Sequence, residues 1–304
     1  MAAELERDVL KGVSRSFYLS LRLLPAPMRR PAGIAYLLAR TSDTIADSAA
    51  IPAAERLGLL DGFSRQICGD EKPAPFPTAL VDATPDPREK LLLECHEESM
   101  AALEILDASA ISLIRDVIGT IISGQKMDLE RFGDHELGKV ISLVNADELE
   151  DYTWRVAGCV GEFWTKLGFE TLGEHYSQCD PVKLISDGIE YGMGLQLVNI
   201  LRDLPKDMRD GRCYLPVVDT NERDELMACF TKWHGIAFGR MARGLEYSSR
   251  LCSKRLRVAS ALPALIAKET LSLMEGVSYD QLEAGIRIPR RQVYSLMLGA
   301  FLIR

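Results

Sequence analysis

The sequence predicts an all-α protein. Apolar residues recur at three- and four-residue spacing along most of the chain, which is the period of one helix face. Alternating apolar and polar runs bounded by turn residues, which would indicate strands, are scarce. The 304 residues are 47% hydrophobic and 26% charged, a soluble globular composition with ample material for a core. We therefore expect helices packed around a buried interior.

The expected helices are separated by proline and glycine signals. Pro25 ends the first helix, Pro31 begins the second, Pro52 precedes the third, Gly133 follows the fifth and Pro181 begins the seventh. The helical pattern covers residues 4–24, 31–48, 53–68, 88–107, 110–131, 147–172, 181–204, 222–252, 258–275 and 291–303.

One long irregular connection is expected at residues 69–88. This stretch, GDEKPAPFPTALVDATPDPR, contains five prolines. Because the helical pattern is similar on both sides of it, we interpret it as a surface loop of a single domain spanning residues 1–304. No repeat of fixed period occurs, so a solenoid is disfavoured.

Charge, termini and cysteines limit the class of protein. The net charge of -8 argues against a nucleic-acid partner, because no basic excess is available to neutralise phosphates. The charged N-terminus and seven scattered cysteines without a CxxC pair indicate a cytoplasmic protein with reduced thiols and no secretory signal. The apolar run 293–303 is shorter than the roughly 20 residues that cross a bilayer. We expect it either to make peripheral membrane contact or to pack in the core.

A first polar row occurs in GIAYLLARTSDTIADS, residues 33–48. Asp43 and Asp47 lie one helical turn apart, and Arg40 and Tyr36 continue the same line upstream. Apolar residues flank the row on the same helix. The row is therefore either a solvated outer face, which is the usual state of an acidic pair at this spacing, or the wall of a site that binds cations.

A second polar row occurs in GIEYGMGLQLVNILRDLPKDMRDGRCY, residues 188–214. Gln196, Asn199, Asp203 and Asp207 follow steps of three, four and four, again on one helix face. Nearly every other residue from 189 to 201 is apolar, which predicts a buried helix. Pro205 removes a backbone hydrogen bond between the two aspartates, so the helix is expected to kink or end there.

Both rows continue backwards onto glycines. The first leads to Gly33, and the second leads to Gly192 and Gly188. Glycine inside a helix costs about 0.5–1 kcal/mol relative to alanine. We therefore expect something bulky to lie against these helix faces.

Buried carboxylates need a cation, and the residue types here favour Mg²⁺. An ionised carboxylate left alone in the interior is prohibitively costly. The four histidines form no HExxH and no Glu-x-x-His pair, so ligands would be oxygens. Mg²⁺ typically takes one or two carboxylates together with waters and substrate phosphates. The rows thus predict a metal-bridged diphosphate site, with basic residues completing the oxygen shell: Arg40, Arg202, Lys206, Arg209 and Arg212.

Four motifs in series resemble the squalene and phytoene synthases, the head-to-head branch of the prenyl synthases. SRSFYLSLRLLP (14–25) is similar to the family's SxSF segment, and YLLARTSDTIAD (36–47) is similar to its YxxxRxxDxxxD motif. DYTWRVAGCVGE (151–162) resembles its YxxxVAGxVG segment, and QLVNILRDLPKDMRDGRCYLP (196–216) resembles its second acidic motif. Order and spacing agree over residues 14 to 216, whereas the tail is similar only through GIRIPRRQ (285–292).

The resemblance implies an isoprenoid-synthase helical fold with a central cavity. By position it assigns Mg²⁺ binding to Asp43, Asp47, Asp203 and Asp207. It assigns contact with diphosphate to Ser14, Ser16, Arg40, Gln196, Asn199 and Arg212. Tyr36 and Tyr152 would face the reacting carbons, with a core tyrosine as the alternative for Tyr152. Where the family often has a glutamate before its second acidic residue, this chain has Ala46.

The implied reaction joins two allylic diphosphates through a cyclopropyl diphosphate. Two farnesyl diphosphates would give squalene, with hydride from NADPH, or a related thirty-carbon product. Two geranylgeranyl diphosphates would give phytoene. SGQKMDLERF (123–132) resembles bacterial squalene-type members and favours the thirty-carbon product. A head-to-tail prenyltransferase or cyclase would usually carry DDxxD, and no adjacent aspartate pair occurs. The remaining alternative is a non-catalytic helical scaffold, although both acidic rows are intact.

Overall fold

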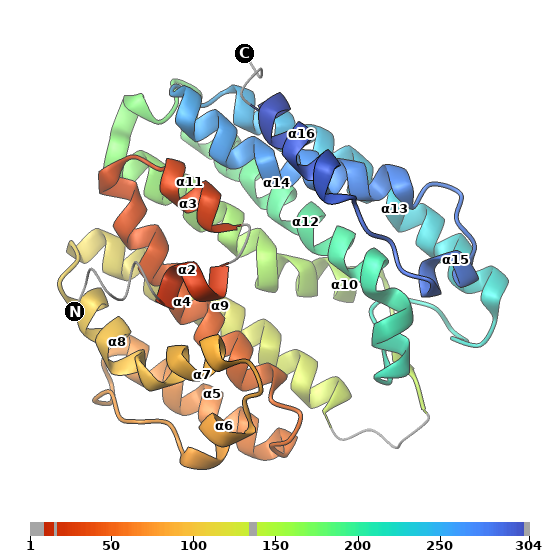
Figure 1. The fold of residues 1–304 in the computed structure, drawn as a ribbon, viewed down its shortest axis with the longest axis horizontal. Coiled ribbons are helices and arrows are strands. Elements are labelled where there is room, and N and C mark those ends of the chain that lie inside the picture. The colour runs from red at the N-terminus through yellow and green to blue at the C-terminus, as the bar shows by residue number, and fades with distance from the viewer. Residues whose placement is uncertain (1–8, 15–16, 134–138, 301–304) are drawn as a thin grey trace. The chain divides into compact units, whose positions relative to one another are not determined.

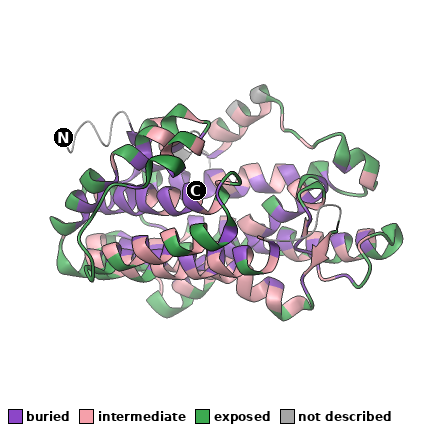
Figure 2. Ribbon diagram, turned by 90° about the horizontal axis from the view of Figure 1, so that it is seen from below, coloured by how far each residue is buried: buried purple, intermediate pink, exposed green. Residues whose placement is uncertain are grey.

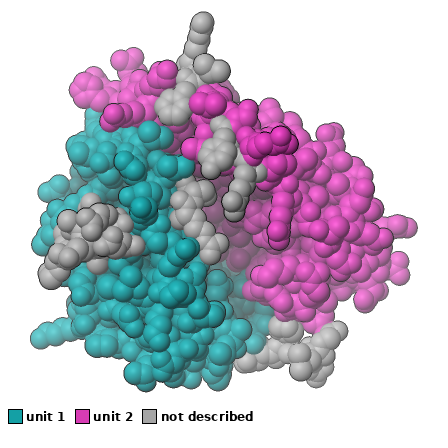
Figure 3. Space-filling model, viewed as in Figure 1, with its two compact units in different colours: residues 1–134, 166–172 teal, residues 135–165, 173–304 magenta. Residues whose placement is uncertain are grey.

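The computed structural model describes residues 9–14, 17–133 and 139–300. The chain divides into two compact units, coloured separately in Figure 3. Unit 1 comprises residues 1–134 and 166–172, and unit 2 comprises residues 135–165 and 173–304. We keep the single domain over residues 1–304 as a prediction, since one domain can contain two such units.

Unit 1 is built around α4 (Ala26–Asp47), which contacts α5 (Ala53–Cys68), α8 (His96–Glu104) and α9 (Ala108–Phe132) (Figure 1). Helices α5 and α9 also pack on each other. The apolar periodicity of the sequence accounts for this packing, because one face of each helix is buried (Figure 2). The remaining helices are α2 (Leu10–Ser14), α3 (Phe17–Leu23), α6 (Thr78–Ala83) and α7 (Pro87–Glu94).

Unit 2 is built around α12 (Pro181–Arg209), the longest helix that the structure describes. It contacts α10 (Ala146–Thr153), α13 (Arg223–Ser249), α14 (Lys254–Leu273) and the π-helical turn η2 (Trp154–Gly158). The other described elements are β1 (Ile141–Ser142), η3 (Gly173–His175), β2 (Arg212–Cys213), α15 (Tyr279–Glu283) and α16 (Arg290–Ala300). Helix α11 (Cys159–Leu172) belongs to unit 2 up to Thr165 and to unit 1 from Lys166.

The all-α prediction is confirmed. Within the described ranges the only strands are β1 and β2, which form a two-stranded parallel sheet. Ile141 pairs with Arg212 and Ser142 pairs with Cys213. This sheet matters for the second polar row, because it fixes the chain directly after α12.

Several predicted helices are interrupted. Residues 88–107 divide at Cys95 into α7 and α8, and residues 147–172 contain the π-helical turn between α10 and α11. In the first predicted helix, 4–24, the described residues form α2 and α3. The periodicity does not reveal such breaks, because a local change of backbone can leave the same side chains on the buried face.

The predicted helix boundaries at two prolines are wrong. Helix α4 begins at Ala26 and includes Pro31, and α12 continues through Pro205 to Arg209. Both prolines are buried. Burial of the apolar helix faces therefore outweighs the hydrogen bond that each ring removes. Asp207 consequently lies inside a helix, one turn after Asp203.

The connection at 69–88 is less irregular than predicted. It contains α6, and its last residues begin α7. Pro77 immediately precedes α6, and Pro87 occupies the first turn of α7, where the missing N–H has no helical partner to lose. Asp86 caps α7 by accepting a hydrogen bond from the Arg88 N–H at 2.9 Å.

The apolar C-terminal segment forms α16, which packs on α14. Ala300 is fully buried, whereas Leu298 is 71% exposed. Among the described helices, none combines the length and the apolar character needed to cross a bilayer.

Candidate active site

The first polar row lies at the edge of the core of unit 1. On α4, Leu38 and Ile45 are fully buried, while the side chains of Arg40 and Asp43 keep 28% and 43% of their surface exposed. Asp47, the last residue of the helix, is exposed. The row is thus neither a fully solvated face nor a buried one, and it presents charged groups beside apolar packing.

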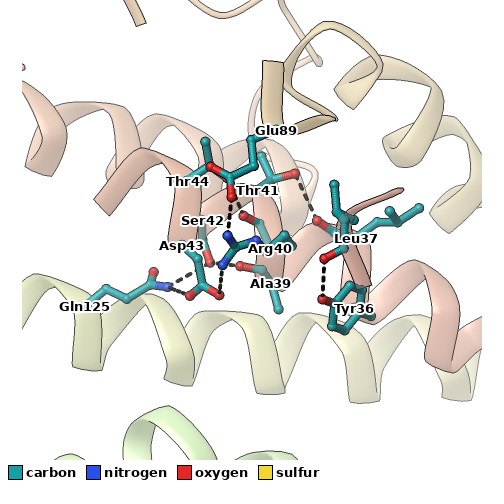
Figure 4. A network of polar contacts seen from close by, with 11 residues as sticks. Tyr36, Leu37, Ala39, Arg40, Thr41, Ser42, Asp43, Thr44, Glu89 and Gln125 are labelled. Atoms are coloured by element: carbon teal, nitrogen blue, oxygen red, sulfur yellow. Dashed lines mark hydrogen bonds and ion pairs between the residues drawn. The ribbon is translucent and has the colours of Figure 1, made fainter. Parts of the chain in front are cut away.

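Arg40 is the centre of the polar contacts in this row (Figure 4). Its Nη2 donates to Oε1 of Glu89 on α7, and its Nη1 lies 3.6 Å from Oδ2 of Asp43. One turn upstream, the Tyr36 hydroxyl donates to the Val13 carbonyl at 3.2 Å and joins α4 to α2. The guanidinium is therefore held between two carboxylates on different helices.

Asp43 has a second partner on α9. The amide nitrogen of Gln125 donates to Asp43 Oδ1 at 2.7 Å and to Ser42 Oγ at 3.1 Å. Gln125 is only 8% exposed. Asp43 is thus contacted on one oxygen by a neutral donor and on the other by a cation.

The environment of Asp43 disfavours its charge. Its pKa is raised to about 6, first by the protein packed around the carboxylate and second by the neighbouring charge of Asp47. Arg40 and Gln125 act in the opposite direction and only partly offset these effects. The first polar row therefore contains an excess of negative charge that a bound cation would neutralise.

The second row extends along the C-terminal half of α12. Gln196 is half-buried, Asn199 is exposed, and the side chains of Asp203 and Asp207 are 40% and 14% exposed. We expected both carboxylates to be buried, and this is wrong for Asp203. The prediction that α12 is buried on most sides is confirmed, since apolar residues such as Leu197 and Leu201 are fully enclosed.

The basic residues near this row pair with local carboxylates. Arg202 donates to both oxygens of Asp203, at 2.8 and 2.6 Å. Lys206 Nζ lies 3.8 Å from Asp210, and Arg209 Nη1 lies 3.4 Å from Glu283 on α15. The charge of the partly exposed Asp203 is therefore neutralised by Arg202, the preceding residue in the sequence. The three- and four-residue spacing of a helix face does not predict this pair, because adjacent residues stand on different faces.

Arg212 joins the end of α12 to β2. Its Nη2 lies 3.7 Å from Asp207 Oδ1 and 3.6 Å from Asp210 Oδ2. Burial raises the pKa of Asp207 to about 6, with Asp203 and Asp210 adding to the rise and Arg212 and Lys206 opposing it. This half of the row resembles the arrangement around Asp43 in combining an acidic pair with arginine, but here Arg202 contacts Asp203 and Arg212 lies beside Asp207.

Tyr152 lies at the end of α10, directly before the π-helical turn. Its ring stacks on Tyr214, with centroids 4.8 Å apart and planes at 18°. Tyr214 follows β2 and is 7% exposed. The orientation of Tyr152 is therefore set by the same segment that positions Arg212.

Of the two serines in the N-terminal segment, the structure describes only Ser14. Ser14 is buried, and its hydroxyl donates to the Leu10 carbonyl one turn earlier in α2. Ser16 lies outside the described residues. The roles assigned to the site residues by resemblance remain predictions.

The glycines beside the rows are covered by protein. A Cβ on Gly192 would overlap the Ala157 carbonyl, and one on Gly188 would lie 2.6 Å from Thr165 Oγ1. In unit 1, a Cβ on Gly33 would lie 3.3 Å from a methyl of Leu10. What packs against these faces is a neighbouring helix, so the glycines indicate close helix contacts rather than ligand contacts.

The donor set fits Mg²⁺. Each row supplies two carboxylates one turn apart, and Mg²⁺ commonly binds through one or two carboxylates, waters and phosphate oxygens. Among the residues that the structure places, no group of three or more His, Cys, Asp and Glu side chains could hold a metal ion alone.

Glu89 and Gln125 were missed by sequence reasoning. The sequence could have indicated Gln125, because it stands on the apolar face of α9 with Ile118, Ile122 and Leu129, where an apolar core residue is expected. A polar residue at such a position usually has a specific partner. Glu89 lies in a charged segment, PREK, and had no comparable signal.

The chain is similar to proteins of known type. A family model described as squalene/phytoene synthase matches residues 10–293. The 15-cis-phytoene synthase of Synechocystis sp. is 32% identical over 223 residues, which are 72% of this chain and 56% of that protein. The bifunctional lycopene cyclase/phytoene synthase of Phaeosphaeria nodorum is 29% identical over 210 residues, 68% of this chain and 33% of that protein. The chain thus spans between a third and just over half of the length of these relatives.

A solved structure is similar over nearly the whole chain. The complex of TcSQS with the ligand E5700 matches with a TM-score of 0.79 at 22% identity, covering 99% of this chain and 88% of that chain. At this identity the similarity shows that the two chains share a fold.

Proposed function

Because the chain belongs to the squalene/phytoene synthase family, we propose that it joins two allylic prenyl diphosphates head to head and releases diphosphate. The shared fold confirms the expected isoprenoid-synthase helical architecture. The observation that supports the proposal most directly is the intact acidic pair in each motif, Asp43 with Asp47 and Asp203 with Asp207. In the first pair Arg40 Nη1 lies 3.6 Å from Asp43 Oδ2, and in the second Arg212 Nη2 lies 3.7 Å from Asp207 Oδ1.

The acidic pairs are proposed to hold Mg²⁺. When bound, Mg²⁺ would neutralise charge on the diphosphate as the allylic C–O bond breaks. Arg40 and Arg212 would bind diphosphate oxygens, and Arg40 has N–H groups for this besides the Nη2 that contacts Glu89. The amides of Gln196 and Asn199, and the hydroxyls of Ser14 and Ser16, would donate further hydrogen bonds.

The carbon chemistry needs protection from water more than it needs reactive side chains. In the first step the C–O electron pair leaves with diphosphate, and the double bond of the second substrate attacks the allylic cation. Loss of a proton then closes a cyclopropyl diphosphate, and a second ionisation rearranges it to the joined chain. Tyr36 and Tyr152 are proposed to lie beside these cations, where an aromatic face stabilises positive charge. Apolar helix faces would exclude water.

Farnesyl diphosphate is the first candidate substrate, with a thirty-carbon product such as squalene. The resemblance of residues 123–132 to bacterial squalene-type members supports it. Reduction to squalene would use hydride from NADPH, whereas loss of a proton would give a dehydro product. Geranylgeranyl diphosphate is the second candidate, favoured by the relatives that are named phytoene synthases.

The test is product identification. The protein is incubated with farnesyl or geranylgeranyl diphosphate, with and without Mg²⁺ and NADPH, and products are identified by mass spectrometry while released diphosphate is measured. We expect Mg²⁺-dependent diphosphate release and a head-to-head product from one of the two substrates. Absence of diphosphate release from both substrates would support the non-catalytic scaffold instead.

Cytoplasmic location and peripheral membrane contact through α16 stay predictions.

A further inference from the structure

Gln125 occupies a core position of α9 without being an apolar residue. The helix face around it is apolar, and Ile121, Ile122 and Leu129 are each buried. Gln125 itself is 8% exposed. A buried amide in such a place requires partners, because its polar groups lose their hydrogen bonds to water.

Both N–H groups of the Gln125 amide are used on α4. One donates to Asp43 Oδ1 at 2.7 Å and the other to Ser42 Oγ at 3.1 Å (Figure 4). The Ser42 hydroxyl donates its own hydrogen to the Ala39 carbonyl at 2.8 Å, so its oxygen can only accept from Gln125. The ionised Asp43 likewise can only accept. These two acceptors fix which way the amide points.

The other end of the amide has no partner. Gln125 Oε1 is buried and accepts no hydrogen bond from the residues that the structure describes. A buried acceptor without a donor is destabilising. The unpartnered oxygen therefore offsets part of the stability that the two donated hydrogen bonds contribute.

The two oxygens of Asp43 are held unequally. Gln125 is 2.7 Å from Oδ1, whereas Arg40 is 3.6 Å from Oδ2, longer than a hydrogen bond. Gln125 thus anchors one oxygen and leaves the other able to change partners. An anchored carboxylate with one available oxygen is what a ligand to a metal ion requires.

We propose that Gln125 is a positioning residue that orients the Asp43 carboxylate for metal binding. The inference rests on the proposed function of the acidic rows. Gln125 acts only through Asp43 and touches neither substrate nor metal. A measurement of metal affinity separates this role from a purely structural one.

The experiment measures metal affinity apart from turnover. Mn²⁺ replaces Mg²⁺ as a probe, and the EPR signal of the free ion is followed during titration of the full chain with farnesyl S-thiolodiphosphate, an analogue that resists ionisation. The variant is Gln125→Met, which keeps side-chain length and removes the amide. The matched control is Gln66→Met, because Gln66 lies on α5 and its amide oxygen contacts His96 on α8 at 3.1 Å. Melting without metal is measured for all three proteins.

The expected result for Gln125→Met is Mn²⁺ binding weakened by about tenfold, the lower end for loss of a residue that supports a metal ligand. Its melting temperature without metal is expected to change by about as much as that of Gln66→Met, because both substitutions remove amide hydrogen bonds. The Mg²⁺ concentration for half-maximal turnover should rise by a similar factor, while Gln66→Met keeps wild-type affinity. Wild-type affinity in Gln125→Met, or a loss that Gln66→Met shares, overturns the inference. Failure of the wild-type protein to bind Mn²⁺ with this analogue and with its geranylgeranyl counterpart instead overturns the proposed function.

Discussion

Gly161 on α11 and Gly188 on α12 lie where two helices touch through their backbones. A Cβ placed on Gly161 would overlap the Gly188 carbonyl, and a Cβ on Gly188 would lie 2.8 Å from the Gly161 carbonyl oxygen. Neither position has room for any side chain. This contact fixes the distance between α12, which carries Asp203 and Asp207, and the segment that follows Tyr152.

Gly188→Ala is therefore expected to destabilise the protein by about 1–3 kcal/mol, the range for overpacking a well-filled interior. The matched control is Gly239→Ala on α13, where nothing lies within 4 Å of the added methyl. That change should stabilise by about 0.5–1 kcal/mol, because alanine loses less backbone freedom than glycine in a helix. Urea unfolding measures both. Equal effects of the two substitutions would show that the helices can separate at no cost.

Arg240 is expected to stabilise unit 2 by joining three helices. From α13 it donates to Glu150 on α10 at 2.6 Å and to Glu190 on α12 at 3.0 Å, and its side chain is 9% exposed. We expect Arg240→Met to cost about 2–3 kcal/mol. This is below the cost of breaking a fully buried pair, because the carboxylates are 36% and 30% exposed.

Arg243→Met provides the comparison for Arg240. Arg243 also contacts Glu190, at 3.6 Å, but it is 59% exposed, so its loss should cost no more than about 1 kcal/mol. Chemical denaturation of the two variants ranks them. A larger loss in Arg243→Met than in Arg240→Met would contradict the importance of burial.

The metal-free protein is expected to lose stability as the pH rises from about 4 to about 6. The pKa of Asp207 is about 6 in the folded protein and 3.8 ordinarily, so the folded state binds more protons in that interval. The contribution of Asp207 is thus complete below pH 4 and lost above pH 6, amounting to at most about 3 kcal/mol. Asp43, with its pKa also raised to about 6, changes in the same direction.

Melting temperature as a function of pH, measured in chelator, tests this dependence. In Asp207→Asn the neutral amide cannot titrate. The decrease in melting temperature between pH 4 and 6 should therefore be smaller than in the wild-type protein. Mg²⁺ should act oppositely on the wild-type protein, stabilising it increasingly as pH rises through 6 and the carboxylates ionise. Identical pH profiles of the two metal-free proteins would show that Asp207 is not perturbed.

Asp43→Asn and Asp203→Asn are each expected to lower turnover by about 100-fold or more, because each would remove a proposed Mg²⁺ ligand on which departure of the diphosphate would depend. Far-UV circular dichroism should remain that of the wild-type protein, since both side chains are partly exposed. Asp82→Asn is the control, at a carboxylate that is 76% exposed and paired with Lys90. Wild-type turnover in either row variant refutes the metal assignment.

Much of the fold and the composition of the rows could be predicted from sequence. Helical periodicity and the step of three or four residues between Tyr36, Arg40, Asp43 and Asp47 are local properties, and the continuous helix α4 places them along one face. The same holds for Gln196 to Asp207 on α12. Interruptions at Cys95 and at the π-helical turn escaped prediction, because they leave the buried face unchanged.

The sequence by itself determined that the protein is helical, which side chains stand in each acidic row, and which family the four motifs resemble. Only the tertiary structure decided the partners of those rows. Glu89 lies 49 residues from Arg40, and Gln125 lies 82 residues from Asp43. Periodicity specifies the face on which a side chain stands but not the helix packed opposite it, so contacts over such separations depend on packing. For the same reason Pro205 did not end α12, since burial of the apolar faces of the helix outweighed the loss of one hydrogen bond.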